Sequence, residues 1–474
     1  MKFGGTSVAN AECVARTAAT ISNAWRETRI VAVVSAQSGV TNSLVQAARL
    51  SEDGDQKSFT SITSLLAQQH ELAINGLIRD HNKRSCLVEE ATQLMNNALA
   101  LCRGTALLGE LTPRALDSIS GIGEQLSARL LAATLCQMGV RSRGIDATAV
   151  IVTNDAHGQA EPLMEETCQR AALCLLPLLE EGILPVVTGF IGATAQGRAT
   201  TLGRGGSDYS ATILGAALNA KEVIIWTDVN GVMTADPRLV PDARTLSEIS
   251  YAEAAELAYF GAKVLHPKTL RPVTEAGIKV QIRNSFEPER PGTRIVRHTN
   301  RTANGVKAIT AIRDVDLITV GGRGMVGVPD VVARTFAATA KAETNILLIS
   351  QSSSQNDICF VVNAADTEHT VEALRHKFAT HSRNDVEHVN IDSDVAIVAV
   401  IGERMRGVPG IAGRVFSALG RERINVIAIA QGASEYNVSL VVQATAMKKA
   451  VVTLHREFRL EQTNPASSDL EVRP

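Results

Sequence analysis

The stretch EVIIWTDVNGVMTADPR (residues 222–238) shows how this chain is built. Its first part is an apolar, β-branched run, which is typical of a buried strand. Its second part is a polar loop with an Asn-Gly turn and an Asp-Pro-Arg segment. Loops after strands hold binding residues, but turn geometry alone also explains Asp and Asn here. The segment therefore predicts a buried strand that ends either in a binding loop or in two tight turns.

The same pattern continues outward from the start of the chain as far as Arg290. Apolar strand-like runs alternate there with Ala- and Leu-rich helical stretches, which predicts an α/β domain with a mainly parallel sheet. Ligands of such domains bind at the carboxyl ends of the strands. Residues 51–110 are polar and helical and are interpreted as an excursion over that edge. The expected strands cover residues 30–36, 183–191, 222–228 and 278–284, and the expected helices include residues 61–78 and 125–136.

The last third of the chain repeats itself. Residues 284–305 carry two prolines and charge without apolar periodicity, and they are interpreted as a connection. Beyond them, Gly-Val-Pro at 327–329 recurs at 407–409, Asn345-Ile recurs as Asn425-Val, and Gln351 recurs as Gln431, always at the same offset. A constant offset indicates two copies of one module. The pattern of strands and helix in each copy corresponds to half or more of a ferredoxin-like βαββαβ unit.

Composition limits the class of protein. The 474 residues carry a net charge of −2 and only 3% aromatic residues, so neither a basic surface nor a stacking platform for nucleic acid is expected. The seven cysteines are scattered without a Cys-x-x-Cys pair, which favours reduced thiols over disulfides or zinc. No apolar run reaches the roughly 18 residues that span a membrane. The start of the chain has no apolar signal region, so a cytoplasmic protein is expected.

Several short segments at predicted strand ends carry charge or hydroxyl groups. KFGGTSV (residues 2–8) is either a strand end with a tight turn or an anion site, because glycines expose backbone N–H groups and Lys2 supplies charge. TTLGRGGSDY (residues 200–209) precedes a helix that Ser207 or Asp208 is expected to cap, and its glycines and arginine form either an anion site at the helix start or only a Gly-rich turn. Glu124 opens another helix, where a carboxylate either binds an ammonium group or complements the helix dipole.

Two further segments have the same character. Residues 35–42 form a strand-to-helix loop with spare hydroxyl groups. Lys263 lies among apolar neighbours before His266-Pro267, and His266 favours a packed structural role over metal binding. The chain has neither the phosphate-loop motif G-x-x-x-x-G-K-[ST] nor the protein-kinase motifs H-R-D and D-F-G. Lysines, an arginine and carboxylates at strand ends nevertheless suit phosphoryl transfer, which depends on positioning and charge neutralisation.

In order and spacing, these segments resemble the aspartate kinases of the amino-acid kinase superfamily, fused to tandem ACT modules. The matching segments are KFGGTSV, VVSAQSGVTN, TTLGRGGSDYS, IWTDVNGVMTADPR and YFGAKVLHP. The resemblance implies transfer of the γ-phosphoryl group of MgATP to the β-carboxylate of L-aspartate. It also implies an amino-acid kinase domain at 1–295, ACT modules at 306–385 and 390–460, and a polar tail at 461–474. Paired ACT modules imply a homodimer or a larger homo-oligomer.

The resemblance also assigns roles to residues. Lys2, Asp208 and Lys263 would be catalytic, and Mg²⁺ would enter with the nucleotide and not through protein ligands. Substrate aspartate would contact Ser35, Thr41, Glu124, Arg204 and Ser207. ATP would contact Lys2, Gly4, Gly5, Thr227, Asp228, Met233, Asp236, Arg238 and Lys263. Similar sequences usually carry an aromatic residue where Met233 stands, which puts nucleotide stacking there in question.

The ACT modules imply feedback control by an amino acid. The segments after Gln351 and Gln431 resemble threonine-inhibited more than lysine-inhibited relatives, so threonine is the favoured effector and lysine the second. The effector would contact Asn345, Gln351, Asn425 and Gln431, although these side chains also suit simple strand ends. Three alternatives stay open: a lysine-inhibited aspartate kinase, another acylphosphate-forming kinase for glutamate or a nucleotide, and a non-catalytic amino-acid sensor on a kinase scaffold.

Overall fold

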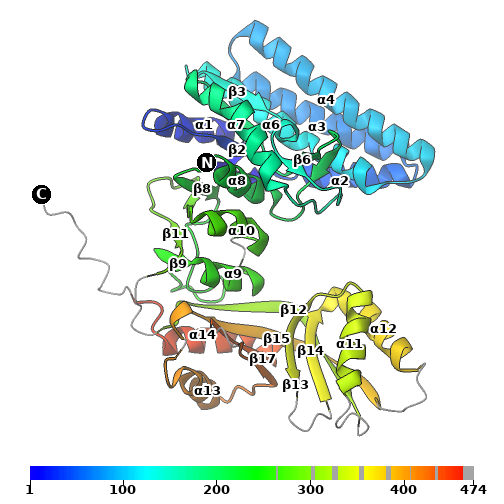
Figure 1. Cartoon of the computed structure of the whole chain (residues 1–474), viewed down its shortest axis with the longest axis vertical. Coiled ribbons are helices and arrows are strands. Elements are labelled where there is room, and N and C mark those ends of the chain that lie inside the picture. Colours follow the sequence, from blue (N-terminus) through cyan, green and yellow to red (C-terminus); the bar gives the residue numbers. More distant parts are fainter. Residues whose placement is uncertain are drawn as a thin grey trace, which may run out of the picture. The chain divides into compact units, whose positions relative to one another are not determined.

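The computed structural model describes residues 1–262, 265–299, 305–322, 329–351, 357–379, 386–405, 407–432 and 436–462. Two compact units make up the chain (Figure 1). The first comprises Met1–Val232, Ser247–Tyr251 and Val264–His298, and the second comprises Met233–Leu246, Ala252–Lys263 and Thr299–Pro474. Two segments of the region predicted as catalytic therefore fold with the second unit. Within the described residues, no helix is long and apolar enough to span a membrane.

The first unit is organised around an eight-stranded sheet, and all its strand pairs are parallel except β10–β11. This confirms the predicted α/β class with a mainly parallel sheet. The order across the sheet is β3-β5-β2-β1-β8-β10-β11-β9. The strands are β1 (Lys2–Phe3), β2 (Ala32–Val34), β3 (Ser142–Ile145), β5 (Leu184–Thr188), β8 (Glu222–Thr227), β9 (Glu248–Ser250), β10 (Lys279–Asn284) and β11 (Thr293–Val296).

Strand β1 is very short but lies in the middle of the sheet. Phe3 is in register with Val34 on one side and with Trp226 on the other, and its ring stacks on that of Trp226 at 5.9 Å. The amino group of Met1 donates to Val31 O at 2.9 Å. Because parallel strands end at one edge, this register brings the residues after β1, β2 and β8 to the same edge.

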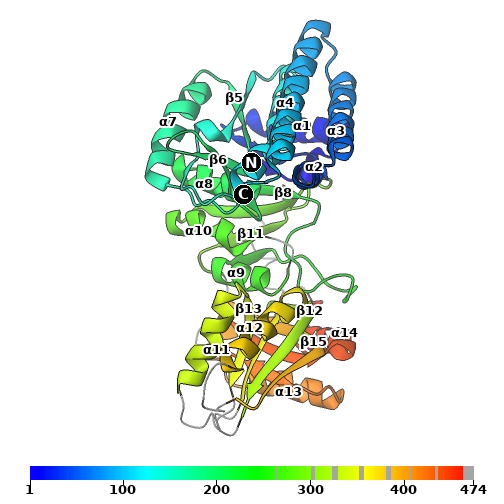
Figure 2. The same cartoon turned by 90° about the vertical axis from the view of Figure 1, so that its right-hand side faces the viewer.

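Helices cover both faces of this sheet (Figure 2). On one face, α6 packs on β2, β3 and β5, and α1 packs on α6, whereas α7 and α8 pack on the other. The region predicted as helical at residues 51–110 forms the long antiparallel pair α3 and α4, which packs on α2 and α6; that it covers the carboxyl edge stays a prediction. The helices are α1 (Ala11–Trp25), α2 (Val40–Glu52), α3 (Gln56–Leu77), α4 (His81–Leu108), α5 (Pro113–Ser120), α6 (Ile122–Gln137), α7 (Met164–Glu180), α8 (Gly206–Ala217), α9 (Tyr251–Tyr259) and α10 (Pro267–Ala276).

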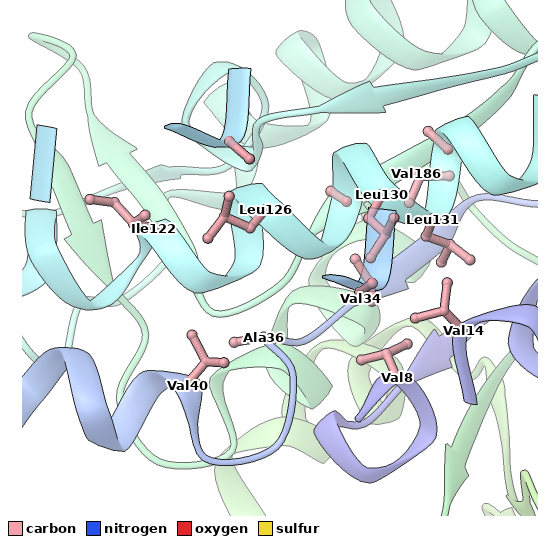
Figure 3. Packing of buried hydrophobic residues seen from close by; sticks show 14 of the residues in the cluster. Val8, Val14, Val34, Ala36, Val40, Ile122, Leu126, Leu130, Leu131 and Val186 are labelled. Carbon is pink, nitrogen blue, oxygen red and sulfur yellow. The ribbon is translucent and has the colours of Figure 1, made fainter. Parts of the chain in front are cut away.

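The main core of the first unit lies between α6 and the sheet. Figure 3 shows Leu126, Leu130 and Leu131 of α6 in this core together with Val34 and Val186. Alternate residues of a strand face opposite sides, and here Ala32 and Val34 belong to this core while Val33 between them does not. Burying apolar side chains is favourable by about 25 cal/mol for each Å² of apolar surface removed from water, and this free energy holds α6 on the sheet.

A smaller sheet lies beside the main one. Strand β6 (Ile191–Thr194) pairs with β4 (Val152–Thr153) in parallel and with β7 (Ala199–Thr201) in antiparallel orientation. The run at 183–191, predicted as one strand, is therefore divided between β5 and β6. Between them Phe190 adopts φ 67°, a left-handed conformation that ends β5 and redirects the chain.

The prediction of a plain connection at 284–305 was wrong in part, because β11 lies within it. Strand β11 pairs with β10 in antiparallel orientation and with β9 in parallel orientation. Its residues alternate between buried Thr293 and Ile295 and the outward Arg294 and Val296, but so short a run after two prolines gives no clear period. Gly292, at φ 69°, makes the turn; a side chain there would overlap Ile282 O.

The second unit contains a six-stranded antiparallel sheet in the order β13-β14-β12-β15-β17-β16. Two ferredoxin-like halves share its long central strands. The strands are β12 (Ala308–Gly321), β13 (Ile346–Gln351), β14 (Asp357–Asn363), β15 (His388–Ile401), β16 (Ala428–Ala430) and β17 (Asn437–Gln443), and the helices are α11 (Pro329–Lys341), α12 (Thr367–Ala379), α13 (Ile411–Arg421) and α14 (Met447–Glu457).

The two halves interleave. The start of β12, Ala308 to Ile312, pairs with the end of β15, so it completes the half that contains β16 and β17. The rest of β12 pairs with β14 and with the start of β15 and belongs to the other half. The first module is thus inserted into the second, with separate cores around Phe360 and around Leu440. The linear boundaries given for the modules stay a prediction.

Candidate active site

The side chains of Lys2 and Asp208 form an ion pair at the carboxyl edge of the main sheet. Lys2 Nζ lies 2.6 Å from Asp208 Oδ1, and Lys2 is only 8% exposed. Asp208 lies in the first turn of α8, where the helix dipole also favours a carboxylate. The N-cap of α8 is Gly205, at φ 71°, so the prediction that Ser207 or Asp208 caps this helix was wrong. Asp208 instead holds the lysine ammonium in a fixed position.

Glu124 is a buried carboxylate in the first turn of α6. Burial raises the pKa of Glu124 to about 8, against the effect of a hydrogen bond from the backbone of Ala36. Its Oε2 atom has no hydrogen-bond partner among the described residues. A buried acceptor without a partner is costly unless a donor or a cation approaches it. The position therefore suits recognition of an ammonium group better than a dipole role alone.

Gly123 allows Glu124 to reach this place. A Cβ atom on Gly123 would lie 2.7 Å from Ala36 Cβ and 3.0 Å from Val40 Cγ1. Only a glycine therefore lets the first turn of α6 contact the loop between β2 and α2. That loop carries Ser35, whose N–H donates to Phe3 O, and it leads to Thr41 in the first turn of α2.

Ser207 and Arg204 lie on the turn between β7 and α8. A Cβ atom on Gly189 would lie 2.6 Å from Ser207 Cβ, so Ser207 packs against the end of β5. Arg204 is exposed. The pKa of His266 is lowered mainly by burial of its imidazole and also by the positive charge of Arg204. Its guanidinium forms no ion pair with the described residues. Arg204 is therefore available for a carboxylate, for which its planar fork suits bidentate binding.

The two glycines after Lys2 differ in what their N–H groups do. Gly4 donates its N–H to Trp226 O at 3.2 Å, which continues the ladder between β1 and β8. A phosphate role for this N–H would require that bond to break. Gly5 begins a 3₁₀ helix (Gly5–Val8), and a Cβ atom there would lie 2.9 Å from Ala36 O. The absence of a side chain at Gly5 therefore allows its backbone to lie close to the carbonyl oxygen of Ala36.

The residues assigned to ATP are divided between the two units. Thr227 and Asp228 follow β8 in the first unit, where Thr227 Oγ1 donates to Asp228 Oδ1 at 3.3 Å. Met233, Asp236 and Arg238 belong to the second unit. Asp236 accepts a bifurcated hydrogen bond from Arg238 Nε, a bond of 2.6 Å from Arg238 Nη2 and one from the backbone N–H of Arg238, and Arg238 lowers the pKa of Asp236.

Some predicted residues lie outside the described residues or on the surface. Lys263, residues 352–354 and the tail from 463 onward are outside them. In the second unit Asn345 and Asn425 precede β13 and β16, while Gln351 ends β13 and Gln431 follows β16; all four are exposed. Among the described residues, no group of three His, Cys, Asp or Glu side chains is arranged to hold a metal ion.

Sequence reasoning missed Asp117, a buried residue of α5. Its carboxylate accepts from Thr201 Oγ1 at 2.5 Å and from Gly158 N at 3.1 Å, and it lies 2.8 Å from His157 Nδ1. These contacts join α5 to the end of β7, shortly before Arg204. An isolated Asp within a helical pattern gives no signal of such contacts, so only the tertiary structure identifies it.

A model of the amino acid kinase family matches residues 1–284, and an ACT-domain model matches residues 318–378 and 398–458. The chain belongs to the amino acid kinase family and carries ACT domains.

Known relatives indicate which kind of kinase the chain resembles. The chain is 35% identical to lysine-sensitive aspartokinase 3 of Escherichia coli over 96% of its own length and 97% of that protein. It is 34% identical to bifunctional aspartokinase/homoserine dehydrogenase 2 of Arabidopsis thaliana, over 98% of its own length. The chain spans about half the length of such bifunctional relatives, 51% in this case.

Solved structures of an aspartokinase resemble the chain as well. The crystal structure of E. coli aspartokinase III in complex with aspartate and ADP matches with a TM-score of 0.80 at 32% identity, over 96% of this chain and 98% of that one. The complex of the same protein with lysine and aspartate matches with a TM-score of 0.79 over the same shares.

Proposed function

We propose that this chain is an aspartate kinase, which transfers the γ-phosphoryl group of ATP to the β-carboxylate of L-aspartate. The arrangement of Glu124 carries this proposal, because its buried carboxylate oxygen, which has no partner in the described part of the chain, is prepared for a substrate ammonium group. The aspartokinases that resemble the chain along most of its length support it. The reaction would be the first step of a pathway to lysine, threonine and methionine.

In the proposed reaction, a β-carboxylate oxygen of aspartate attacks the γ-phosphorus, and the bond to the β,γ-bridging oxygen breaks. The products are an acylphosphate and ADP, and no proton has to leave the attacking carboxylate. Lys2, held by Asp208, would neutralise charge on the transferring group, and Lys263 would join it. Mg²⁺ would enter with the nucleotide and screen its phosphates.

The residues at the α-carbon of the substrate would set specificity. Arg204 would bind the α-carboxylate in a bidentate fork, and Glu124 would bind the α-ammonium group. Ser35, Thr41 and Ser207 would add hydrogen bonds.

An ADP-release assay with L-aspartate tests the proposal. Turnover is expected with L-aspartate, but not with succinate, which lacks the ammonium group, or β-alanine, which lacks the α-carboxylate. Lys2→Ala is expected to lower kcat by about a hundred- to a thousand-fold. Wild-type-like turnover in Lys2→Ala would refute the assignment of Lys2. Glutamate as the better acceptor would favour another acylphosphate kinase, and no ATP turnover with any acceptor would favour the sensor.

The ACT modules support control by an amino-acid effector, and threonine remains our first candidate. Lysine is the second candidate, because a relative of 35% identity is named lysine-sensitive. Adding threonine and lysine in turn to the ADP-release assay distinguishes the two effectors.

A further inference from the structure

The loop that contains Met233, Asp236 and Arg238 is built into the second unit. Ile309 N, at the start of β12, donates to Thr234 O at 2.8 Å, and Thr234 N donates to Arg244 O at 2.9 Å. Ala235, Leu239 and Val240 are buried in the same core as α13 and α14. The conformation of this loop therefore depends on the ACT half that contains α14.

One buried polar contact joins the loop to α14. Thr234 Oγ1 and His455 Nε2 are 3.0 Å apart, and the two residues are 0% and 2% exposed. Thr234 Oγ1 also accepts the N–H of Arg244 at 3.1 Å, and Arg244 Nε donates to Leu460 O just after α14. His455 Nδ1 faces Glu461 at 3.8 Å. A neutral imidazole that accepts the Thr234 O–H satisfies the hydroxyl, because its oxygen is then free to accept from Arg244.

We propose that His455 is a positioning residue for nucleotide binding: through Thr234 it fixes the loop whose Asp236 and Arg238 contact ATP. The inference rests on the proposed function, because that function assigns the loop to ATP. Thr234 lies directly between Met233 and Ala235, just before Asp236. Loss of the buried contact would leave a polar group without a partner and allow the loop to shift. The expected consequence is weaker binding of ATP with unchanged binding of aspartate.

The test is steady-state kinetics on the full chain, with ATP varied at saturating aspartate and aspartate varied at saturating ATP. His455→Leu is expected to raise KM for ATP about five- to tenfold, the effect of one buried hydrogen bond. KM for aspartate is expected to stay within about twofold. His455→Gln is expected to restore KM for ATP, because its amide reaches the place of Nε2. Thr234→Ser should behave like wild type, whereas Thr234→Val should not.

The matched control is His369→Leu. His369 lies on α12, the corresponding helix of the other ACT half, and its Nε2 is 3.4 Å from Thr344 Oγ1. This variant removes a His–Thr contact that is exposed and lies far along the chain from the loop, and KM for ATP is expected to be unchanged. The double variant His455→Leu/Thr234→Val should be no worse than the poorer single variant, since both remove one interaction.

Three results would overturn the proposal. They are an unchanged KM for ATP in His455→Leu, a parallel rise of both KM values, and an equal effect in His369→Leu. If His455→Leu does not fold, the Thr234→Ser and Thr234→Val pair decides the question by the same criterion. If wild type releases no ADP with aspartate, the proposed function fails instead. Calorimetric titration of each variant with MgATP then still tests whether His455 positions the loop.

Discussion

At the scale of single residues, the candidate site combines an ion pair with a buried carboxyl group of raised pKa. Lys2 and Asp208 neutralise each other at the edge of the sheet, whereas Glu124 has an oxygen without a partner among the described residues. A carboxylate whose pKa is raised by burial is a candidate for function, because structural carboxylates are usually paired.

Glu124 makes a prediction about pH. Its pKa of about 8 means that it is largely protonated at pH 6 and ionised above pH 8. In the proposed function the substrate ammonium group binds the ionised form of Glu124, so binding would release a proton, and KM for aspartate should fall as the pH rises from 6 to 8. The limiting slope is about tenfold per pH unit. Initial rates at varied aspartate and pH measure it.

Glu124→Gln supplies the control for this prediction. The amide cannot ionise, so KM for aspartate should be higher at pH 8 and nearly independent of pH. The same slope in Glu124→Gln as in wild type would assign the titration to another group.

Asp117 makes a prediction about stability. Asp117→Asn replaces one acceptor oxygen by a donor, so Thr201 Oγ1 or His157 Nδ1 loses its contact with a carboxylate oxygen, whereas Gly158 N, which contacts both oxygens, keeps one. Chemical denaturation should show a loss of about 1–3 kcal/mol. KM for aspartate should also rise, because β7 leads to Arg204. Asp55→Asn, at the N-cap of α3, is the control and should change nothing, since Asn caps helices as well as Asp. Unchanged stability of Asp117→Asn would mean that the network tolerates an amide.

At the scale of elements, close contact between α6 and the loop after β2 shapes the site. Gly123→Ala would place a methyl group 2.7 Å from Ala36 Cβ and displace the first turn of α6 together with Glu124. We expect a rise of KM for aspartate of at least about tenfold, measured by initial rates. Such overpacking costs about 1–3 kcal/mol.

Gly104→Ala is the matched control for Gly123→Ala. Gly104 lies within α4, and a Cβ atom there meets nothing within 4 Å. The substitution should therefore stabilise the protein by about 0.5–1 kcal/mol and leave the kinetics unchanged. A wild-type KM for aspartate in Gly123→Ala would show that the loop adjusts and that glycine is dispensable there.

At the scale of the whole molecule, the repeat is regular in sequence although the two ACT halves interleave in the structure. The starts of β14 and β17 are separated by the same offset along the chain as the starts of α12 and α14. The two halves nevertheless exchange strand segments through β12 and β15. The proposed effector residues and the loop of Thr234 therefore belong to one unit with a shared sheet.

Effector inhibition is the prediction at this scale. In the ADP-release assay, threonine should inhibit wild type, and Gln351→Ala and Gln431→Ala should each raise the concentration that gives half of the inhibition by about fivefold or more. Each rate is compared with the same variant without effector. Inhibition by lysine but not by threonine would show that lysine is the effector. An unchanged concentration for half of the inhibition in both variants would show that these glutamines do not bind the effector.

Features that follow from hydrophobic periodicity and from turn residues were predictable from the sequence. The α/β class, the strand at residues 222–227 and the internal repeat of the last third depend on local patterns of apolar residues and turns. The cap of α8 and β11 were not predictable: Gly205 rather than Asp208 adopts the capping geometry, and β11 exists because β10 and β9 flank it.

The sequence by itself determined which chemical groups stand at the strand ends, because strand and loop positions follow from local hydrophobic patterning. Only the tertiary structure decided how these groups act. Packing on α6 leaves one oxygen of Glu124 without a partner among the residues that the structure describes, the register of β1 brings Lys2 to Asp208, and the loop of Thr234 packs into the core around α14. Burial and pairing depend on contacts between residues far apart in the chain, and such contacts have no local signal in a sequence.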